Sequence, residues 1–191
     1  MTADYKLTLP PQSLETAEPA AKLILERAQR EGGFIPNMYA GMANLPPLLE
    51  TYLDGAGRFR REAGFSPVEQ EVVFLTISRI NGCEYCMSAH SLIADAKSKV
   101  PPAVTEALRN AAPVPDPKLA ALSTFTETMV ASRGLPSKTD VQAFLGAGYE
   151  ERHVLGIVLA IAVKTLSNYA NHLLHTPLDS MFASREWKKS A

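Results

Sequence analysis

The sequence predicts an all-α fold, and three observations support this prediction. No segment shows a convincing run of the two-residue alternation of apolar and polar side chains that a half-buried strand requires. Apolar residues instead recur at helical spacing almost throughout the 191 residues, and glycine, proline and capping residues separate the stretches. With 46% hydrophobic and 20% charged residues, the chain can bury a sizeable core and is not an intrinsically disordered protein.

Four helices are predicted in the N-terminal half of the chain. They occupy residues 19–31, a stretch that follows the turn at 34–37, residues 46–62 and residues 67–80. Gly32 and Gly33 end the first of them, since glycine accepts the left-handed conformation of a helix cap. Ser66 and Glu69 form a capping box at the start of the fourth. Because that helix is apolar on most sides, we expect it to be buried.

Five further helices are predicted after an interruption at Asn81-Gly82. They occupy residues 83–97, 101–111, 118–133, 137–145 and 150–175. Prolines make residues 113–117 a stiff internal linker. We expect one domain over residues 1–191, in which residues 66–97 form a helical hairpin.

A shift of about 82 residues suggests an internal duplication. It aligns Val72 with Val154 and His90 with His172, and it aligns the two cysteines with a threonine and an asparagine. The chain would then consist of two pseudo-repeated helical halves, one of which lacks the thiols. Because helical segments share their periodicity by default, chance similarity remains the alternative.

Charge and hydropathy exclude several classes of partner. Nineteen basic and 20 acidic residues leave a net charge of −1, which provides no general attraction for nucleic acid. The longest strongly apolar run, Val154–Val163, is too short to cross a bilayer, so we expect no membrane partner. The N-terminal segment has neither the basic nor the apolar region of a secretion signal, and we therefore expect a cytoplasmic protein.

The chemistry is predicted at Cys83-Glu-Tyr-Cys-Met-Ser-Ala-His90, which contains the two cysteines of the chain. On a helix, Cys83 and Cys86 are three residues apart and Cys86 and His90 are four apart, so the three share one face. Free backbone N–H groups at a helix start favour a thiolate. His90 can exchange a proton with Cys86, and the second thiol can resolve an oxidised first one as a disulfide.

Glu71 is the candidate carboxylate behind this motif. It begins an otherwise apolar run, and a carboxylate that faces inward needs a partner because an unpaired buried charge is costly. His90 would be that partner, in a Glu–His–Cys relay in which the acid fixes the imidazole tautomer. Alternatively, Glu71 is a surface residue of the first helical turn.

Two other interpretations of the cysteines remain open. The pair can be two small buried hydrophobic residues. It can also be part of a zinc site, since C-x-x-C-x-x-x-H supplies three soft ligands and Glu71 or His172 could supply a fourth. The sequence has no second C-x-x-C or H-x-x-x-H pair, so we expect neither a metal nor a cofactor.

A glutamate, a C-x-x-C twelve positions later and a histidine after three more residues, in an all-helical chain of this length, resemble a known family. This is the AhpD-like alkylhydroperoxidase group of the carboxymuconolactone decarboxylase superfamily. The specific resemblance covers about Ser66–Ala94, and weaker likeness lies in Gly33–Asn37, Asn168–Leu173 and Thr176–Asp179. It implies an AhpD-like helical bundle with repeated halves and a homo-oligomer.

The resemblance also implies a thiol-dependent peroxidase that reduces organic hydroperoxides or hydrogen peroxide. By carry-over, Cys86 attacks the peroxide and becomes a sulfenic acid, Cys83 closes the disulfide, and His90 with Glu71 forms the proton relay. The implied electron donor is a dithiol partner such as a lipoylated protein. The alternatives are a thiol–disulfide exchange or redox-sensing protein with little peroxide turnover, and a structural helical oligomer.

Tyr85 departs from the family pattern, because members of the group have a second histidine immediately before the second cysteine. A phenol can hydrogen-bond a peroxide oxygen, but with a pKa of about 10 it is a poor base. We therefore retain Tyr85 as a catalytic candidate in a slower or retuned relay. The decarboxylase branch generally lacks the cysteine pair, which argues against that activity here.

Three remaining features receive weaker assignments. His172 is the second-tier catalytic candidate, although a core or interface histidine fits it better. Arg58, Arg60 and Arg61 are interpreted as a solvated face. The arm at Leu7–Pro11 and the tail around Trp187 are candidates for wrapping a neighbouring subunit, or for disorder.

Overall fold

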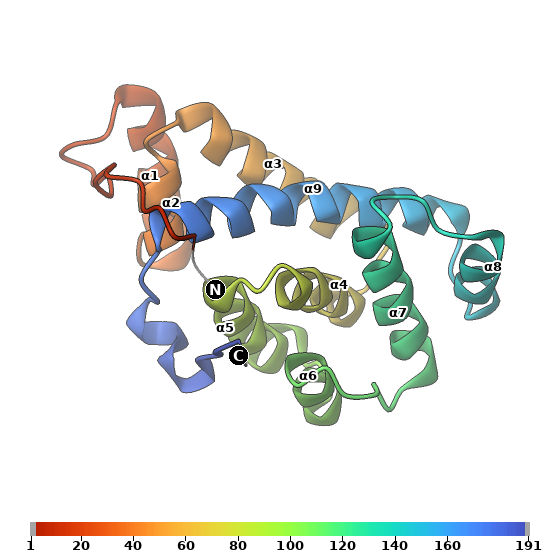
Figure 1. Ribbon diagram of the computed structural model, residues 1–191. Coiled ribbons are helices and arrows are strands. Elements are labelled where there is room, and N and C mark those ends of the chain that lie inside the picture. The colour runs from red at the N-terminus through yellow and green to blue at the C-terminus, as the bar shows by residue number, and fades with distance from the viewer. Residues whose placement is uncertain (1–2, 190–191) are drawn as a thin grey trace.

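The computed structural model describes residues 3–189, and these residues contain helices and no strand, so the predicted all-α class is confirmed (Figure 1). The α-helices are α1 Pro19–Gly32, α2 Asn37–Met42, α3 Pro46–Glu62, α4 Pro67–Ile80, α5 Glu84–Ile93, α6 Pro102–Arg109, α7 Pro117–Ala131, α8 Lys138–Gly146 and α9 Glu151–Leu174. A π-helix, Ala94–Ser98, extends α5, and a 3-10 helix spans Ser180–Arg185.

The largest difference from the predicted boundaries lies in the segment that carries the motif. The predicted helix 83–97 begins at Glu84, changes to a π-helix after Ile93 and leaves Cys83 in an extended conformation before its first turn. Pro117, expected in the linker, is the first residue of α7, because Asp116 caps that helix by accepting the Leu119 N–H. The pseudo-repeat stays a prediction, since α9 runs unbroken where its counterpart is split into α4 and α5.

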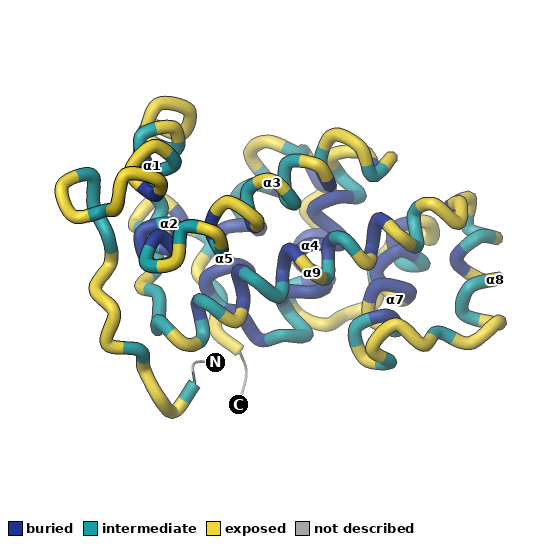
Figure 2. Tube along the Cα trace, turned by 90° about the horizontal axis from the view of Figure 1, so that it is seen from above, coloured by how far each residue is buried: buried dark blue, intermediate teal, exposed yellow. Residues whose placement is uncertain are grey.

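The core is organised around α4. Helices α5, α6, α7 and α9 all pack against it, and its residues from Gln70 to Ser78 are buried. Figure 2 shows α4 among the dark-blue buried segments, with α3 and α9 running beside it. The apolar composition of α4 therefore has the consequence that the sequence predicts, because a helix covered on all sides has no face left for solvent.

Two glycines allow α3 and α9 to lie close together along their length (Figure 1). A Cβ at Gly55 of α3 would lie 2.9 Å from a methyl group of Val163. A Cβ at Gly156 of α9 would lie 3.0 Å from the ring of Phe65. Both distances are below ordinary van der Waals contact, so larger side chains would push the two helices apart.

Helix α9 deserves separate mention because, among the described residues, it is the one helix long and apolar enough to cross a membrane. About half of it is buried inside the protein, and the buried face includes the polar residues Lys164, Ser167 and Asn171. This burial against α3, α4 and α5 is that of a core helix in a soluble helical domain.

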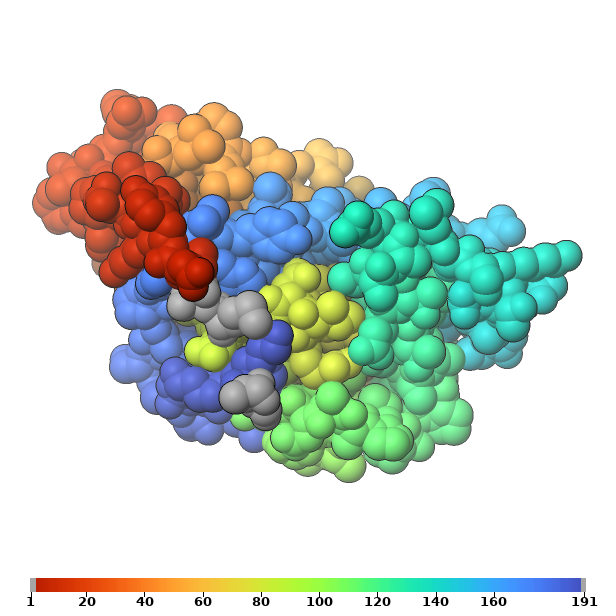
Figure 3. All heavy atoms as spheres, in the orientation of Figure 1, coloured from red at the N-terminus to blue at the C-terminus, as the bar shows by residue number. Residues whose placement is uncertain are grey.

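The two ends of the described chain pack on their own protomer rather than projecting from it. In the N-terminal arm, the Leu7 N–H donates to Leu173 O and the Gln12 N–H donates to Ala40 O. In the C-terminal tail, Trp187 donates from Nε1 to Arg109 O and from its backbone to Ser88 Oγ. Figure 3 shows both segments on one face of the molecule.

Candidate active site

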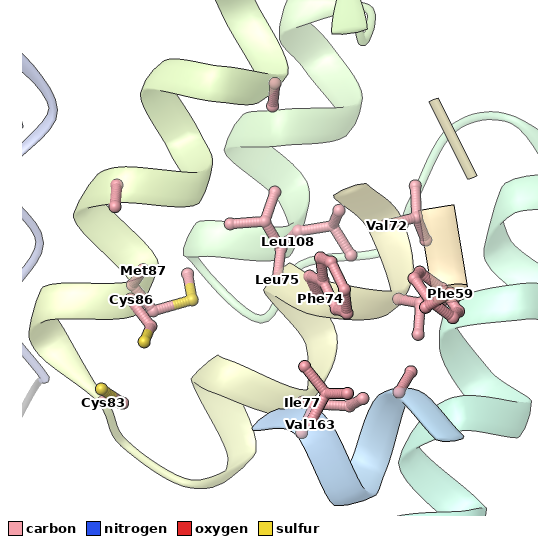
Figure 4. Packing of buried hydrophobic residues seen from close by; sticks show 14 of the residues in the cluster. Phe59, Val72, Phe74, Leu75, Ile77, Cys83, Cys86, Met87, Leu108 and Val163 are labelled. Carbon is pink, nitrogen blue, oxygen red and sulfur yellow. The ribbon is translucent and has the colours of Figure 1, made fainter. Parts of the chain in front are cut away.

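The two cysteines lie where the chain turns from α4 into α5. Gly82 adopts a positive φ of 68°, and the following Cys83 N–H donates to Ser78 O at 2.9 Å, so the chain reverses within three residues of the end of α4. Cys83 occupies the N-cap of α5 and Cys86 its first turn (Figure 4). Both thiols are free and buried. The predicted position of the sulfurs at a helix start is therefore the one that the structure shows.

Glu71 lies inside the protein and is bound at both of its oxygens. Its Oε2 is 2.8 Å from His90 Nδ1, and its Oε1 accepts a hydrogen bond of 2.7 Å from Arg60 Nη2. Burial raises the pKa of the Glu71 carboxyl, but His90 and Arg60 outweigh burial and leave this pKa below its usual value. The alternative that Glu71 is a surface residue is wrong, because its side chain has no exposed area.

Arg60 corrects a second assignment made from the sequence. Its side chain is about one-third exposed, and besides Glu71 it donates to Gln70 Oε1 at 3.1 Å. Arg58 and Arg61 are exposed, as predicted for the whole cluster. The basic cluster is thus divided, and Arg60 is the member whose position on α3 directs it toward α4.

The His90 ring lies between the acid and the sulfurs. It packs on the Phe74 ring at 5.0 Å between centroids. Burial, and then the positive charge of Lys164, lower the pKa of His90, so the ring is neutral at pH 7 and donates from Nδ1 to Glu71. In residues 3–189, no hydrogen bond joins this ring to either sulfur, although Cys86 and His90 affect each other electrostatically. The structure therefore assembles the Glu–His half of the relay and leaves a gap before Cys86.

Helix α9 supplies the polar contacts to the sulfurs that sequence reasoning missed. Asn171 Nδ2 donates to Cys86 Sγ at 3.4 Å and to Cys83 Sγ at 3.7 Å. The Cys86 thiol in turn lies 4.0 Å from Ser167 Oγ. Lys164, one turn earlier on the same face, is buried. Polar residues at positions i, i+3 and i+7 in an apolar helix were the signal in the sequence.

The environment separates the two thiols electrostatically. Burial raises the pKa of Cys86, but its hydrogen bond with Cys83 and the nearby Lys164 and His90 outweigh burial and hold that pKa well below its usual value. The hydrogen bond with Cys86, together with burial, raises the pKa of Cys83 well above its usual value. Cys86 is therefore the sulfur that carries the negative charge, and Cys83 is the one that keeps its proton.

Tyr85 lies on the same turn, but its hydroxyl group donates to Asp179 Oδ2. Asp179 also accepts the backbone N–H of Asn37, at 3.1 Å. Burial and the Asp179 carboxylate raise the pKa of Tyr85 further above that of a free phenol. The side chain consequently joins α5 to α2 and to the C-terminal segment, and it is not a base at neutral pH.

The remaining candidate residues are not assembled with the sulfurs. His172 is half-buried and stacks on Tyr169 at 6.3 Å between ring centroids, and burial lowers its pKa. Within the part of the chain that the structure describes, no group of three or more His, Cys, Asp or Glu side chains is placed to hold a metal ion. Glu71, suggested as a fourth zinc ligand, is bound by Arg60 and His90 instead.

Comparisons with known proteins agree with this fold and this motif. The profile of the carboxymuconolactone decarboxylase family matches residues 46–139, a stretch that contains Glu71, both cysteines and His90. The fold is of the AhpD-like helical class. The chain belongs to the carboxymuconolactone decarboxylase superfamily, as the motif predicts.

Three solved structures illustrate the likeness. An alkylhydroperoxidase AhpD core described as an uncharacterized peroxidase-related protein, from Ralstonia eutropha JMP134, has a TM-score of 0.80 and 21% identity over 91% of this chain and 93% of its own. A peroxidase-related protein from Silicibacter sp. TM1040 has a TM-score of 0.75 and 20% identity over 94% and 97%. The debrominase Bmp8, in complex with 2,3,4-tribromopyrrole, has 0.72 and 15% over 94% and 96%. No curated protein matches the chain.

Proposed function

We propose that this protein is a thiol-dependent peroxidase that reduces organic hydroperoxides or hydrogen peroxide. The observation that carries the proposal is the pair of neighbouring sulfurs whose pKa values are moved in opposite directions, with that of Cys86 lowered and that of Cys83 raised. A peroxidase of this kind needs one thiolate to attack and one protonated thiol to resolve the product. Membership of the superfamily and the peroxidase-related structural neighbours add support.

In the first step, the Cys86 thiolate attacks one oxygen of the peroxide. A sulfur–oxygen bond forms, the oxygen–oxygen bond breaks, and the leaving oxygen takes a proton to become an alcohol, or water when the substrate is hydrogen peroxide. His90 is the candidate proton carrier, because Glu71 holds Nδ1 and leaves Nε2 to exchange the proton. We expect a bound peroxide to bridge the gap between this ring and Cys86.

In the second step, Cys83 attacks the sulfenic acid on Cys86. The disulfide forms and the hydroxyl group leaves as water with the proton of the Cys83 thiol. A dithiol, for which a lipoylated protein is the proposed source, then reduces the disulfide and is itself oxidised to a disulfide. Tyr85 is assigned a positioning role in this sequence, because its proton is bound to Asp179.

Stopped-flow decay of cumene hydroperoxide with the pre-reduced protein tests the proposal. The parent protein should consume peroxide repeatedly when a dithiol is supplied. Cys86→Ser should abolish consumption, whereas Cys83→Ser should complete one turnover and stop at the sulfenic acid. If Cys86→Ser consumes peroxide as fast as the parent, the attacking sulfur is assigned wrongly, and if the parent exchanges disulfides rapidly but leaves peroxide intact, the protein is a disulfide-exchange or redox-sensing protein.

The likeness to a debrominase favours one second candidate, reductive debromination of a brominated pyrrole. The same two thiols would replace one bromine by hydrogen and release bromide and a proton, while they themselves become the disulfide. The reduced protein incubated with 2,3,4-tribromopyrrole separates the two candidates. Release of one bromide per disulfide formed, with no consumption of peroxide, would replace the peroxidase assignment.

Copies of the chain are also proposed to associate through the outer face of α9. Large apolar side chains are exposed there, among them Leu155 at 73%, Val158 at 47% and Tyr169 at 54%. A contiguous exposed apolar surface of this kind is typical of contact surfaces between proteins. Sedimentation of the parent and of Val158→Glu checks the proposal, since the parent should be an oligomer and the variant should dissociate.

A further inference from the structure

Lys164 is a buried cation for which the proposed reaction has no use so far. Its side chain lies in the core at 1% exposure, and its Nζ has no hydrogen-bond partner among the described residues. The Phe74 ring lies 5.4 Å from this Nζ. An aromatic ring compensates only part of the cost of burying an ammonium group, so a group of opposite charge is required nearby.

The neighbouring helices offer few candidates for that charge. The titratable and charged groups that face the cluster are Tyr39 of α2, Tyr52 and Arg60 of α3, Glu71 of α4, and Cys83, Cys86 and His90 of α5. Burial raises the pKa of both tyrosines, and burial together with Lys164 lowers that of His90, so these three are neutral at pH 7. Glu71 is neutralised by Arg60, with which it forms an ion pair of 2.7 Å.

Only the two sulfurs then remain, and the geometry selects Cys86. Lys164 and Ser167 are three residues apart on one face of α9, and Ser167 Oγ is 4.0 Å from Cys86 Sγ. Asn171, one further turn along that face, donates to the same sulfur at 3.4 Å. The ring of Phe74 contacts both Lys164, at 5.4 Å, and His90, at 5.0 Å, which places the ammonium group on the His90 side of the site.

We propose that Lys164 is the counter-ion of the Cys86 thiolate and supplies the positive charge that Tyr85, bound to Asp179, is unable to provide. With Cys86 ionised, the buried cluster is neutral, because Arg60 balances Glu71 and Lys164 balances Cys86. With Cys86 protonated, one positive charge is left without a partner in the core. This inference rests on the proposed function only in taking Cys86 as the reacting sulfur.

Ultraviolet absorbance of the thiolate, followed as a function of pH, tests the inference without any peroxide. In the Cys83→Ser background, where Cys86 is the single thiol, the parent should retain thiolate absorbance below neutral pH. Lys164→Met keeps the length of the side chain and removes its charge, and it should move the thiol titration upward by about one pH unit or more, a tenfold or greater loss of thiolate at a given pH. Lys164→Arg should titrate close to the parent.

Lys118→Met is the matched control, because Lys118 is half-exposed and pairs with Glu69 on the surface. It should leave the titration of Cys86 unchanged. The Met variant is expected to fold, because replacement of a buried charge by an apolar side chain of similar length is tolerated. A titration curve of Lys164→Met that superimposes on that of the parent would overturn the inference. It would leave the peroxidase proposal standing, since that proposal is decided by peroxide consumption.

Discussion

Helices α3 and α9 lie side by side and have opposite distributions of polarity. Helix α3 buries apolar residues such as Leu49 and Phe59, while its charged residues Arg58 and Arg61 are exposed. The C-terminal half of α9 instead buries a lysine, a serine and two asparagines, and large apolar residues lie on its outer face. Both helices are equally part of the core, yet only α3 follows the usual rule for a surface helix.

The difference separates two kinds of contribution to the protein. Burial of apolar residues stabilises the fold, so α3 contributes to stability. Burial of polar groups costs free energy unless they have partners, and the partners of the α9 groups include the two sulfurs. The inverted half of α9 is therefore placed where reactivity, rather than stability, requires it. The predictions that follow test this contrast.

The largest effect on stability is expected from α3. Leu49→Ala removes a side chain with no exposed area and should lower the free energy of unfolding by about 3 kcal/mol, the typical result of a large-to-small change in a packed core. Urea unfolding measures this change. Leu23→Ala is the control, because Leu23 is 68% exposed and its loss should matter little. Single-turnover peroxide consumption by the folded Leu49→Ala protein should stay near that of the parent, and a large loss of rate would contradict the contrast.

Asn171 of α9 should show the reverse behaviour. Asn171→Leu removes the amide that donates to both sulfurs, and the rate of peroxide consumption should fall roughly 10- to 100-fold, because a hydrogen bond to a charged group contributes about 1.5–3 kcal/mol. Stability should change less than in Leu49→Ala. Asn110→Leu, at an exposed asparagine, serves as the control. An unaltered rate in Asn171→Leu would show that the amide does not hold the thiolate.

The smallest effect concerns the acid side of neutrality. The folded state lowers the pKa of His90 below its ordinary 6.5 and that of Glu71 below its ordinary 4.5. For both groups the unfolded chain binds protons more readily, so stability is full above these ordinary values and falls as the pH is lowered. The urea midpoint should therefore decline from about pH 6.5 downward, first through His90 and then through Glu71. His90→Asn should flatten the first part of the decline, and a midpoint that rises on acidification would refute the assignment.

The sequence was sufficient for the fold class and for the motif. Ser66 and Glu69 predict the start of α4, and Gly82 predicts the break that places both cysteines at a helix start. These are local signals, in which spacing along the chain determines spacing in the structure. The Glu71–His90 contact was predictable for a different reason, namely that a carboxylate in an apolar helix needs a partner.

The residues that the sequence did not reveal act across long separations in the chain. Arg60, Lys164 and Asn171 reach the site only because α3 and α9 pack on α4 and α5, and a basic or amide residue in a helix gives no sign of which way it faces. Asp179 was part of a recognised stretch, but its pairing with Tyr85 depends on the path of the C-terminal segment. In α9, burial of polar residues overrides the pattern by which inward faces are usually identified.

A fixed ammonium group next to one sulfur also bears on the direction of electron flow. When the disulfide forms, the negative partner of Lys164 disappears while the lysine stays in place, so the oxidised protein holds a charge that the reduced protein had balanced. A dithiol–disulfide pair whose reduced form is selectively stabilised is a stronger oxidant. The disulfide of this protein should accordingly be easily recharged by mild donors and short-lived in a reducing milieu.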